Sequence, residues 1–344
     1  MLSISISDIS RILYDFQIYE NAVSFSEMQR YDYEKGDQKS KNVRLIIKVM
    51  FDAHPPVVMR FKNEDDVTLE SVEAQSRFAA LLLENGVETP MQFRSDGNYA
   101  RPYHIDGYDV IVTVEIFADG EVKYVNAEIA EKTGSLLANT HNISEMSNAH
   151  IQNRVLFDPL SENDLFDFYL LEENEQYLNS VDSNTLHEII SLKNEYLSVI
   201  SPLEKDGRYA VQGDISNCNL YMTENGQIGV FDFNRCGDNV LFFDAVMQAV
   251  FESRLMDYDD DDPNREKKLL SAFLNGYHKI RQFTDKQKSA YPYLYALIDA
   301  FWASDIIWND NSLKNLILRN DQDKIRFCLH MIKERLCAKN KIPI

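Results

Sequence analysis

Three polar residues, Asp214, Asn219 and Asp232, surround a predicted β-hairpin in the stretch AVQGDISNCNLYMTENGQIGVFDFN, residues 210–234. Residues 225–226, Asn-Gly, form the strongest short-range hairpin signal, a two-residue loop with positive φ at both positions. This turn predicts that Asn219 lies directly opposite Asp232, where the Cβ atoms of paired residues are about 4.5 to 5.5 Å apart. An amide oxygen and a carboxylate oxygen would then converge at the open end of the hairpin.

Such oxygens are hard ligands that suit Mg²⁺, which takes one or two carboxylates and completes its octahedron with water and substrate phosphates. Asp214 lies on the loop before the hairpin, five residues ahead of Asn219, close enough to face the same ion without binding it. A loop Asp, an Asn and a second Asp after a hairpin match the D-x-x-x-x-N and D-F-x elements of kinase-type phosphoryl transfer. In that chemistry the first Asp accepts the proton of the attacking hydroxyl, while the Asn and the second Asp hold Mg²⁺ on the nucleotide phosphates.

Taken alone, each of these residues is more typical of local capping of a turn or strand. Their joint spacing favours a site, because the apolar run IGVF leads directly into Asp232 and a further acidic residue, Asp244, follows in FFDAV. The task of the protein in such chemistry is to position groups and to neutralise charge.

The composition is that of a globular chain of 344 residues with 44% apolar and 26% charged residues, long enough for two lobes that each bury a core. A formal net charge of -20 argues against nucleic acid as a partner, because phosphate binding draws on clustered Lys and Arg. The four cysteines show no CxxC spacing, which predicts reduced thiols in a cytoplasmic protein. No uncharged run approaches the roughly 20 residues of a membrane span. The N-terminal stretch carries Asp8 and Asp15 and no basic segment, which indicates an amphipathic helix and not a signal peptide.

The pattern of apolar residues predicts two parts of different character. Residues 22–62 alternate in strand fashion between polar or proline-bearing breaks, which predicts three consecutive antiparallel strands. Residues 68–90 have helical spacing, and residues 103–120 predict one or two further strands. Beyond them the predicted helices cover residues 124–141, 162–175, 183–200, 240–255, 265–283 and 285–308. We therefore expect an α+β fold with a strand-rich lobe at 1–117 and a mainly helical lobe at 118–344.

At the hairpin the sequence resembles the aminoglycoside phosphotransferase and choline kinase-like family, small-molecule kinases with a protein-kinase-like, two-lobe fold. GDISNCN resembles the H-G-D-x-x-x-x-N loop of that family, and IGVFDFN resembles its strand that ends in a metal-binding Asp. The resemblance implies that Asp214 is the catalytic base, that Asn219 and Asp232 bind Mg²⁺, and that Asp244 is structural. Gly213, where protein kinases have Arg, favours small-molecule kinases.

Weaker motifs extend the resemblance over the nucleotide-binding lobe. PVVMRF resembles the strand that carries a cation toward the α and β phosphates; Arg60 is in the matching place, with Lys62 a competitor on the same face. The next helix then supplies a Glu that pairs with this cation, and Glu73 fits best, with Glu70 second. VTVEIFADG resembles the hinge segment, in which backbone groups of Glu115 to Phe117 would hydrogen-bond adenine. The plainer alternative for Arg60 and Glu73 is solvated charge on a strand edge and a helix face.

In the second lobe, GSLLANTH resembles the family helix that ends in His, which predicts a buried, hydrogen-bonded His141. The segment from FLNGYHKI to ASDII resembles the C-terminal helical pair of homoserine kinase-like members. Two departures stand out. Gln212 replaces the usual His of the catalytic loop and can hydrogen-bond but not titrate. No glycine-rich phosphate loop is visible between the first strands, where only Gly36 occurs.

Together these features predict transfer of the γ-phosphoryl group of ATP (or GTP), with Mg²⁺, to a hydroxyl of a small molecule. The acidic run MDYDDDDPNRE, residues 256–266, could attract a cationic acceptor such as an aminoglycoside or an amino alcohol, although a solvated loop is the simpler interpretation. Asp299 and Asp305 are better candidates for lining an acceptor pocket, whereas Trp302 is more typical of a core. A homoserine kinase-like enzyme and a non-catalytic, nucleotide-binding pseudokinase stay open as alternatives, and the chain would be a monomer or a homodimer.

Overall fold

The computed structural model describes residues 1–32, 42–161, 165–254 and 262–338. The chain forms two compact units, one made of Met1–Lys123 and Asn217–Asn234, the other of Tyr124–Ser216 and Arg235–Ile344. These bounds differ from the predicted lobes 1–117 and 118–344, because the segment that carries Asn219 and Asp232 returns to the first unit.

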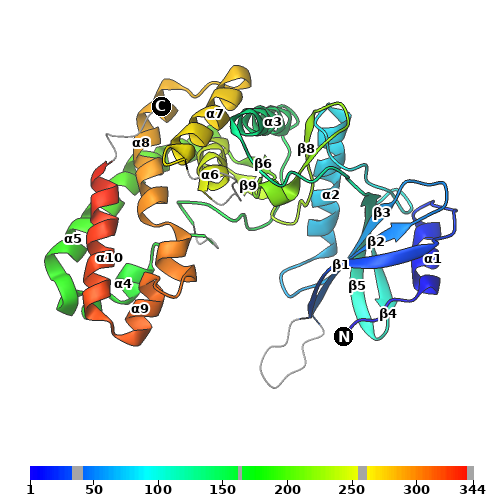
Figure 1. The fold of residues 1–344 in the computed structure, drawn as a ribbon, viewed down its shortest axis with the longest axis horizontal. Helices are drawn as coiled ribbons and strands as arrows, with labels where there is room; N and C mark the ends of the chain where they lie inside the picture. The colour runs from blue at the N-terminus through cyan, green and yellow to red at the C-terminus, as the bar shows by residue number, and fades with distance from the viewer. Residues whose placement is uncertain (33–41, 162–164, 255–261, 339–344) are drawn as a thin grey trace. The chain divides into compact units, whose positions relative to one another are not determined.

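The first unit is built on a five-stranded antiparallel sheet in the order β1-β2-β3-β5-β4 (Figure 1). Its strands are β1 (Ser24–Asp32), β2 (Val43–Met50), β3 (Val57–Asn63), β4 (Ala100–Ile105) and β5 (Tyr108–Ile116). The first three strands follow one another as an antiparallel meander. This confirms the prediction made from the alternating pattern of residues 22–62.

One face of this sheet forms the apolar core of the unit, because successive side chains of a strand point to opposite faces. Helix α1 (Ile6–Asp15), capped by Ser5, covers this face with Ile9, Ile12 and Leu13 (Figure 1). The strand residues in this core occupy alternate positions and include Leu45, Ile47, Met59, Phe61, Val112 and Val114. The predicted amphipathic N-terminal helix is therefore present.

The opposite face of the sheet carries charged side chains together with the apolar Ile46 and Val58. Arg60 and Lys62 alternate with the core residues of β3, and Arg44 on β2 lies beside Lys62. Helix α2 (Leu69–Glu84) begins at a capping box of Thr68 and Ser71. Gln75 of this helix lines the same small cavity as Arg60 and Lys62. The charged side chains of β3 therefore share this cavity with a neutral side-chain amide from α2.

The hairpin is joined to the first unit by its backbone. It consists of a 3-10 turn η2 (Asn217–Asn219) and strands β7 (Leu220–Met222) and β8 (Ile228–Val230). The amide of Val122 donates to the carbonyl of Leu220 at 3.1 Å, and the amide of Val230 donates to the carbonyl of Glu88 at 2.9 Å. These bonds to two other segments explain why the hairpin belongs to this unit.

The second unit is mainly helical, as predicted, and also holds a two-stranded sheet of β6 (Tyr209–Val211) and β9 (Gly237–Asn239) that the sequence did not predict. Its α-helices in the described residues are α3 (Ala127–Met146), α4 (Leu170–Glu173), α5 (Glu175–Ile200), α6 (Leu241–Arg254), α7 (Arg265–Ile280), α8 (Asp285–Ala300), α9 (Leu313–Arg319) and α10 (Gln322–Cys337).

Two helix predictions for this unit need correction, and two further helices were not predicted. Residues 165–169 are not helical, so the helix predicted at 162–175 is reduced to α4 and the first residue of α5; residues 162–164 lie outside the described residues. Helix α8 ends at Ala300 and a π-helical turn, Ser304–Trp308, follows it. Helices α9 and α10 lie beyond the last predicted helix.

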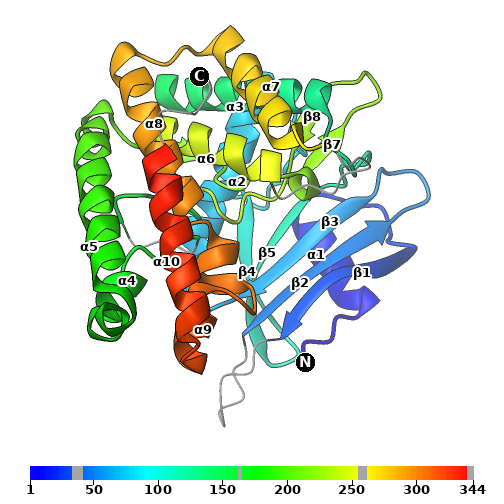
Figure 2. The same ribbon diagram turned by 60° about the vertical axis from the view of Figure 1, so that its left-hand side comes forward.

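Helices α3 and α7 lie side by side at a glycine contact (Figure 2). A Cβ atom on Gly134 would lie 2.0 Å from the carbonyl oxygen of Phe273, and one on Gly276 would lie 1.9 Å from that of Glu131. Only glycine permits this approach. Among the described helices, none has the length and apolar character that crossing a membrane requires.

Candidate active site

The hairpin loop has three residues, not the predicted two. The backbone carbonyl of Thr223 accepts from the amide of Gly226, and the backbone amide of Thr223 donates to the carbonyl of Gln227, both at 2.9 Å. Of the Asn-Gly pair, only Gly226 has a positive φ, 73°. A turn closed by a left-handed glycine is the usual form of a three-residue hairpin loop, and it satisfies the same sequence signal with a different register.

The cross-strand register is consequently shifted by one residue from the prediction. Leu220 pairs with Val230, and the amide of Phe231 donates to the carbonyl of Asn219 at 2.9 Å. Asn219 therefore lies opposite Phe231, and the predicted direct pairing of Asn219 with Asp232 is wrong. Both residues still belong to the same end of the hairpin, with Asp232 one position further along the chain.

Asp232 adopts the left-handed backbone conformation, with φ of 59°. Residues other than glycine are uncommon there, although Asp and Asn adopt it more readily than most, and five other non-glycine residues in the described chain also have a positive φ. The Nη1 atom of Arg60 lies 3.7 Å from Oδ2 of Asp232. Burial alone would raise the pKa of Asp232, but Arg60 and then Lys62 lower it below its usual value. The carboxylate is thus held ionised in a strained turn.

Arg60 pairs with Glu115 of β5, and the predicted pairing with Glu73 or Glu70 is wrong. Nε and Nη2 of Arg60 donate to Oε1 of Glu115 at 3.1 and 2.9 Å. Glu73 instead accepts the backbone amides of Tyr99 and Ala100 at 2.7 and 2.8 Å. Glu70 is exposed. The physical reason is the helix phase, because the α2 residues that line the cavity beside Arg60 are Gln75, Ser76 and Ala79, and Glu73 is not among them.

Lys62 contacts the side-chain oxygen of Asn234, and Gln75 donates to the backbone carbonyl of Asn234 at 3.0 Å. Lys62 is 6% exposed; burial, and then the charge of Arg60, lower its pKa to about 8. The cavity among these side chains has a volume of about 20 Å³, room for roughly one water molecule. Sequence reasoning missed Gln75 and Asn234, although Asn234 directly follows the Asp-Phe pair of the motif.

The segment from Glu115 to Phe117 uses most of its amides within the protein. Ile116 donates to the carbonyl of Met91 at 2.9 Å, and Phe117 donates to that of Pro56 at 2.8 Å. Pro56 has no N–H that could donate to the carbonyl of Phe117 in turn. This carbonyl can therefore still accept a hydrogen bond. Lys48 lies over the Phe117 ring, 3.4 Å from its centroid. The role of this segment in binding a nucleobase stays a prediction.

In the second unit, the loop of Asp214 is fixed by neutral amides. Oε1 of the fully buried Gln212 accepts the backbone amide of Asp214 at 2.7 Å, and Oε1 of Gln248 accepts that of Ile215 at 3.0 Å. Gly213 has φ of 80°, and a Cβ there would lie 2.6 Å from the carbonyl oxygen of Arg235. Gln212 thus braces the backbone of the residue that the resemblance marks as the base.

His141 is a buried structural residue, as predicted. Its Nε2 is 3.0 Å from Oδ2 of Asp244, and its Nδ1 is 2.9 Å from the hydroxyl of Tyr277. Burial lowers the pKa of His141. Asp244 also accepts from Nε2 of Gln248 at 3.2 Å, so this network reaches the Asp214 loop through Gln248. Sequence reasoning missed Gln248, which lies four residues after Asp244 on the same helix face.

The predicted acceptor-binding carboxylates are engaged in ion pairs. Asp299 pairs with Arg254 and Asp305 pairs with Arg335, at 2.7 and 2.6 Å. Trp302 is buried, with the Arg254 guanidinium 5.0 Å from its ring centroid. Asp257, Asp259, Asp260 and Asp261 of the acidic run, and Gly36, lie outside the described residues.

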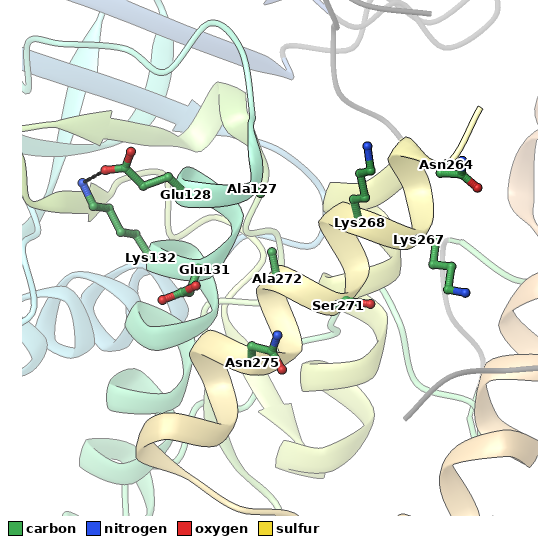
Figure 3. A pocket seen from close by; sticks show the side chains of 10 residues that line it. All are labelled: Ala127, Glu128, Glu131, Lys132, Asn264, Lys267, Lys268, Ser271, Ala272 and Asn275. Atoms are coloured by element: carbon green, nitrogen blue, oxygen red, sulfur yellow. Dashed lines mark ion pairs between the residues drawn. The ribbon is translucent and has the colours of Figure 1, made fainter. Parts of the chain in front are cut away.

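A larger hollow, of about 750 Å³, lies between α3 and α7 (Figure 3). Residues of both charges line it, including Glu128 and Lys132, which pair at 2.9 Å. Lys267 and Lys268 of α7 project from its other side (Figure 3). None of the predicted site residues is in its lining, so this hollow does not enter the proposed function.

No family model matches the sequence, and no curated protein matches it significantly. Solved structures do match nearly the whole chain. A microcompartment-associated aminopropanol kinase is 13% identical, with a TM-score of 0.59, over 98% of this chain and 97% of that chain. An amicoumacin kinase in complex with AMP-PNP and Ca²⁺ is 16% identical, with a TM-score of 0.56, over 95% and 94%. An aminoglycoside phosphotransferase from Alicyclobacillus acidocaldarius is 13% identical, with a TM-score of 0.53, over 90% and 92%.

The structural neighbours of this chain over nearly its whole length are thus small-molecule kinases of the aminoglycoside phosphotransferase type. The five-stranded sheet with a single helix before the mainly helical part is the arrangement that the resemblance implied. The predicted fold class, α+β and protein-kinase-like, is confirmed.

Proposed function

We propose that this chain, which has the fold of small-molecule kinases, transfers the γ-phosphoryl group of ATP or GTP to a hydroxyl group of a small acceptor. The observation that carries the proposal is the turn at Asp232. It presents an ionised carboxylate in the left-handed conformation, two residues after the end of the apolar strand β8 and beside Arg60. Strain of this kind is retained where a ligand needs the geometry.

The charged face of the sheet would bind the nucleotide. Arg60 supplies positive charge for its phosphates in a chain whose net charge is -20, and the carbonyl of Phe117 can accept a hydrogen bond from the base. Glu115 contributes through its side chain, because it holds Arg60 by two hydrogen bonds. The pairing of Glu73 with the backbone of Tyr99 and Ala100 removes it from this role.

Asn219 and Asp232 would hold the divalent cation. The bond from Phe231 to Asn219 keeps the two residues at one end of the hairpin, and their amide and carboxylate oxygens fit Mg²⁺, which binds through one or two carboxylates plus phosphates and water. When bound, Mg²⁺ would neutralise the charge that develops on the phosphates.

Asp214 would act as the general base. The acceptor oxygen forms a bond to the γ-phosphorus while the bond from that phosphorus to the β–γ bridging oxygen breaks, and the hydroxyl proton goes to the carboxylate. The products are a phosphate ester and a nucleoside diphosphate. Gln212 supports this role by accepting the backbone amide of Asp214, a task for which it does not need to titrate.

For the acceptor, an amine-bearing alcohol is the class we favour. The structural neighbours are named for aminopropanol, amicoumacin and spectinomycin, and the first of these names is that of an amino alcohol. A net charge of -20 attracts cations over long range. Asp299 and Asp305 are not assigned to this pocket, because Arg254 and Arg335 pair with them.

The test is a product search with a matched inactive variant. The protein is incubated with ATP or GTP, MgCl₂ and a panel of amino alcohols, aminoglycosides and hydroxy acids, and products are identified by mass spectrometry. We expect an acceptor 80 Da heavier, one added HPO₃ group, from the wild type and none from Asp232→Asn. Nucleotide binding without any product would favour the pseudokinase alternative, and the absence of both binding and product would overturn the proposal.

A further inference from the structure

The residues that follow Asp232 are held from two separate elements of the first unit. The backbone amide of Asn234 donates to Oδ1 of Asp232 at 3.3 Å, which closes the turn locally. The ring of Phe233 packs edge-on against Phe78 of α2, with centroids 6.2 Å apart. The turn of residues 232–234 is therefore anchored on both its polar and its apolar side.

Two buried side chains from different elements contact Asn234. The ammonium of Lys62, on β3, contacts the side-chain oxygen of Asn234, while the amide of Gln75, on α2, donates to its backbone carbonyl at 3.0 Å. Lys62 and Gln75 are each 6% exposed. Polar groups at this depth are usually retained with their partners satisfied, and here they share the same partner residue.

The two cations of β3, Arg60 and Lys62, have different hydrogen-bond partners. Arg60 forms its hydrogen bonds with Glu115 and lies 3.7 Å from Asp232, beyond the usual N–H···O distance. Lys62 contacts the neutral side-chain amide of Asn234. In this arrangement Arg60 is held by Glu115, while Lys62 and Gln75 hold Asn234, two residues after Asp232.

We propose that Lys62 and Gln75 are positioning residues that clamp Asn234 and thereby hold the Asp232 turn in its metal-binding conformation. This inference rests on the proposed function, in which Asp232 binds the nucleotide's Mg²⁺. It assigns Lys62 to the support of a metal ligand, whereas the sequence placed Lys62 as a competitor of Arg60 for the phosphates.

The first experiment separates metal affinity from nucleotide affinity. Nucleotide binding to Lys62→Met is measured by calorimetry in EDTA and then across a Mg²⁺ titration. Loss of an outer-shell partner typically weakens metal binding by about 10- to 100-fold, so we expect such a shift in the Mg²⁺ dependence with unchanged binding in EDTA. Arg77→Met removes a cation from the exposed side of α2. It should change neither the Mg²⁺ dependence of nucleotide binding nor the binding in EDTA.

A second experiment needs no ligand. Hydrogen exchange of the amides of Phe233 and Asn234 is compared in the metal-free wild type, Lys62→Met, Gln75→Ala and Arg77→Met. The clamp predicts faster exchange in the first two variants and wild-type exchange in the third. In a double-mutant cycle, Lys62→Met and Asn234→Ala should be non-additive in Mg²⁺ affinity, because they remove the same contact.

Three results would overturn the inference. Equal loss of nucleotide affinity with and without Mg²⁺ in Lys62→Met would make Lys62 a phosphate ligand. Unchanged exchange at Phe233 and Asn234 would show that the turn stands without the clamp, and additive effects would separate Lys62 from Asn234. If the wild type bound no nucleotide, the proposed function would fail, while the exchange experiment would still decide whether the clamp exists.

Discussion

The Asp232 turn and the Asp214 loop are two acidic segments that are held by different sets of polar groups. Around Asp232 two of the supporting side chains are cations, with Arg60 in contact with Glu115 and Lys62 in contact with Asn234, and the third is the neutral Gln75. Around Asp214 they are neutral amides, with Gln212 and Gln248 accepting backbone N–H groups.

This difference follows from what each segment is proposed to do. A metal ligand must be ionised before the metal arrives, and nearby cations lower the pKa of Asp232 despite its burial. A general base needs a defined position, which hydrogen bonds to its backbone provide without placing a fixed charge beside it. Asp232 therefore depends on nearby cations, whereas Asp214 depends on hydrogen bonds to its backbone. Substitutions can remove the cations or these hydrogen bonds independently.

The largest effect should come from breaking the ion pair of the first unit. Arg60→Met leaves Glu115 buried beside no cation of its own, and breaking a buried pair from one side costs about 3–5 kcal/mol. We expect that loss in the free energy of unfolding, measured by urea denaturation without nucleotide. The control is Arg60→Met with Glu115→Met, which should recover much of the loss. A cost below about 1 kcal/mol for the single variant would contradict the importance of the pair.

An intermediate effect should come from the Asp214 loop, which neutral side-chain amides hold. Gln212→Leu removes the acceptor of the Asp214 amide and leaves a buried N–H unsatisfied, which costs about 1–3 kcal/mol. Gln212→His, which restores the residue common in the resembled family, should retain most of the stability. The same denaturation experiment measures both. Equal stability of the Leu variant and the wild type would mean that the loop does not depend on this bond.

The smallest effect should depend on pH and comes from Glu252, a buried carboxyl group on α6. In the described part of the chain neither of its carboxyl oxygens has a hydrogen-bond partner, and burial raises its pKa well above the usual value. Burial therefore favours the protonated form of Glu252 in the folded state. Its contribution is fully present below the pKa of the unfolded chain and is lost as pH rises toward the folded pKa.

Glu252→Gln stays neutral at every pH and serves as the matched comparison. Its free energy of unfolding relative to the wild type should increase from pH 5 to pH 8, as measured by urea denaturation at each pH. A constant difference between the two proteins over this range would show that Glu252 does not carry the predicted shift.

Much of the fold could be predicted from the sequence, because alternation and helical spacing are local signals. The three-strand meander and α2 follow from such patterns, whereas the burial of His141 and the kinase-like fold were implied by the resemblance of short motifs. The hairpin register could not be predicted with the same success. Asn225-Gly226 satisfies either a two-residue or a three-residue loop, and one residue of difference moves the partner of Asn219 from Asp232 to Phe231.

Charge pairing was the other point that the sequence left undetermined. Glu73 has the right type to pair with Arg60, but its place on α2 gives it backbone partners, and Glu115 of β5 takes the guanidinium. Pairing across elements depends on the phase of a helix relative to a sheet, which no local pattern encodes. The short pairing of β6 with β9 was missed for a related reason, since each strand has only three residues.

The most direct test of the central claim is phosphoryl transfer by Asp214→Asn, compared with the wild type at equal nucleotide occupancy. General-base catalysis contributes about 10²- to 10⁴-fold, so we predict that kcat falls by that factor while the affinity for Mg²⁺ and nucleotide, measured by calorimetry, stays within about twofold. Transfer at the wild-type rate by Asp214→Asn, with the nucleotide bound as before, would contradict the account.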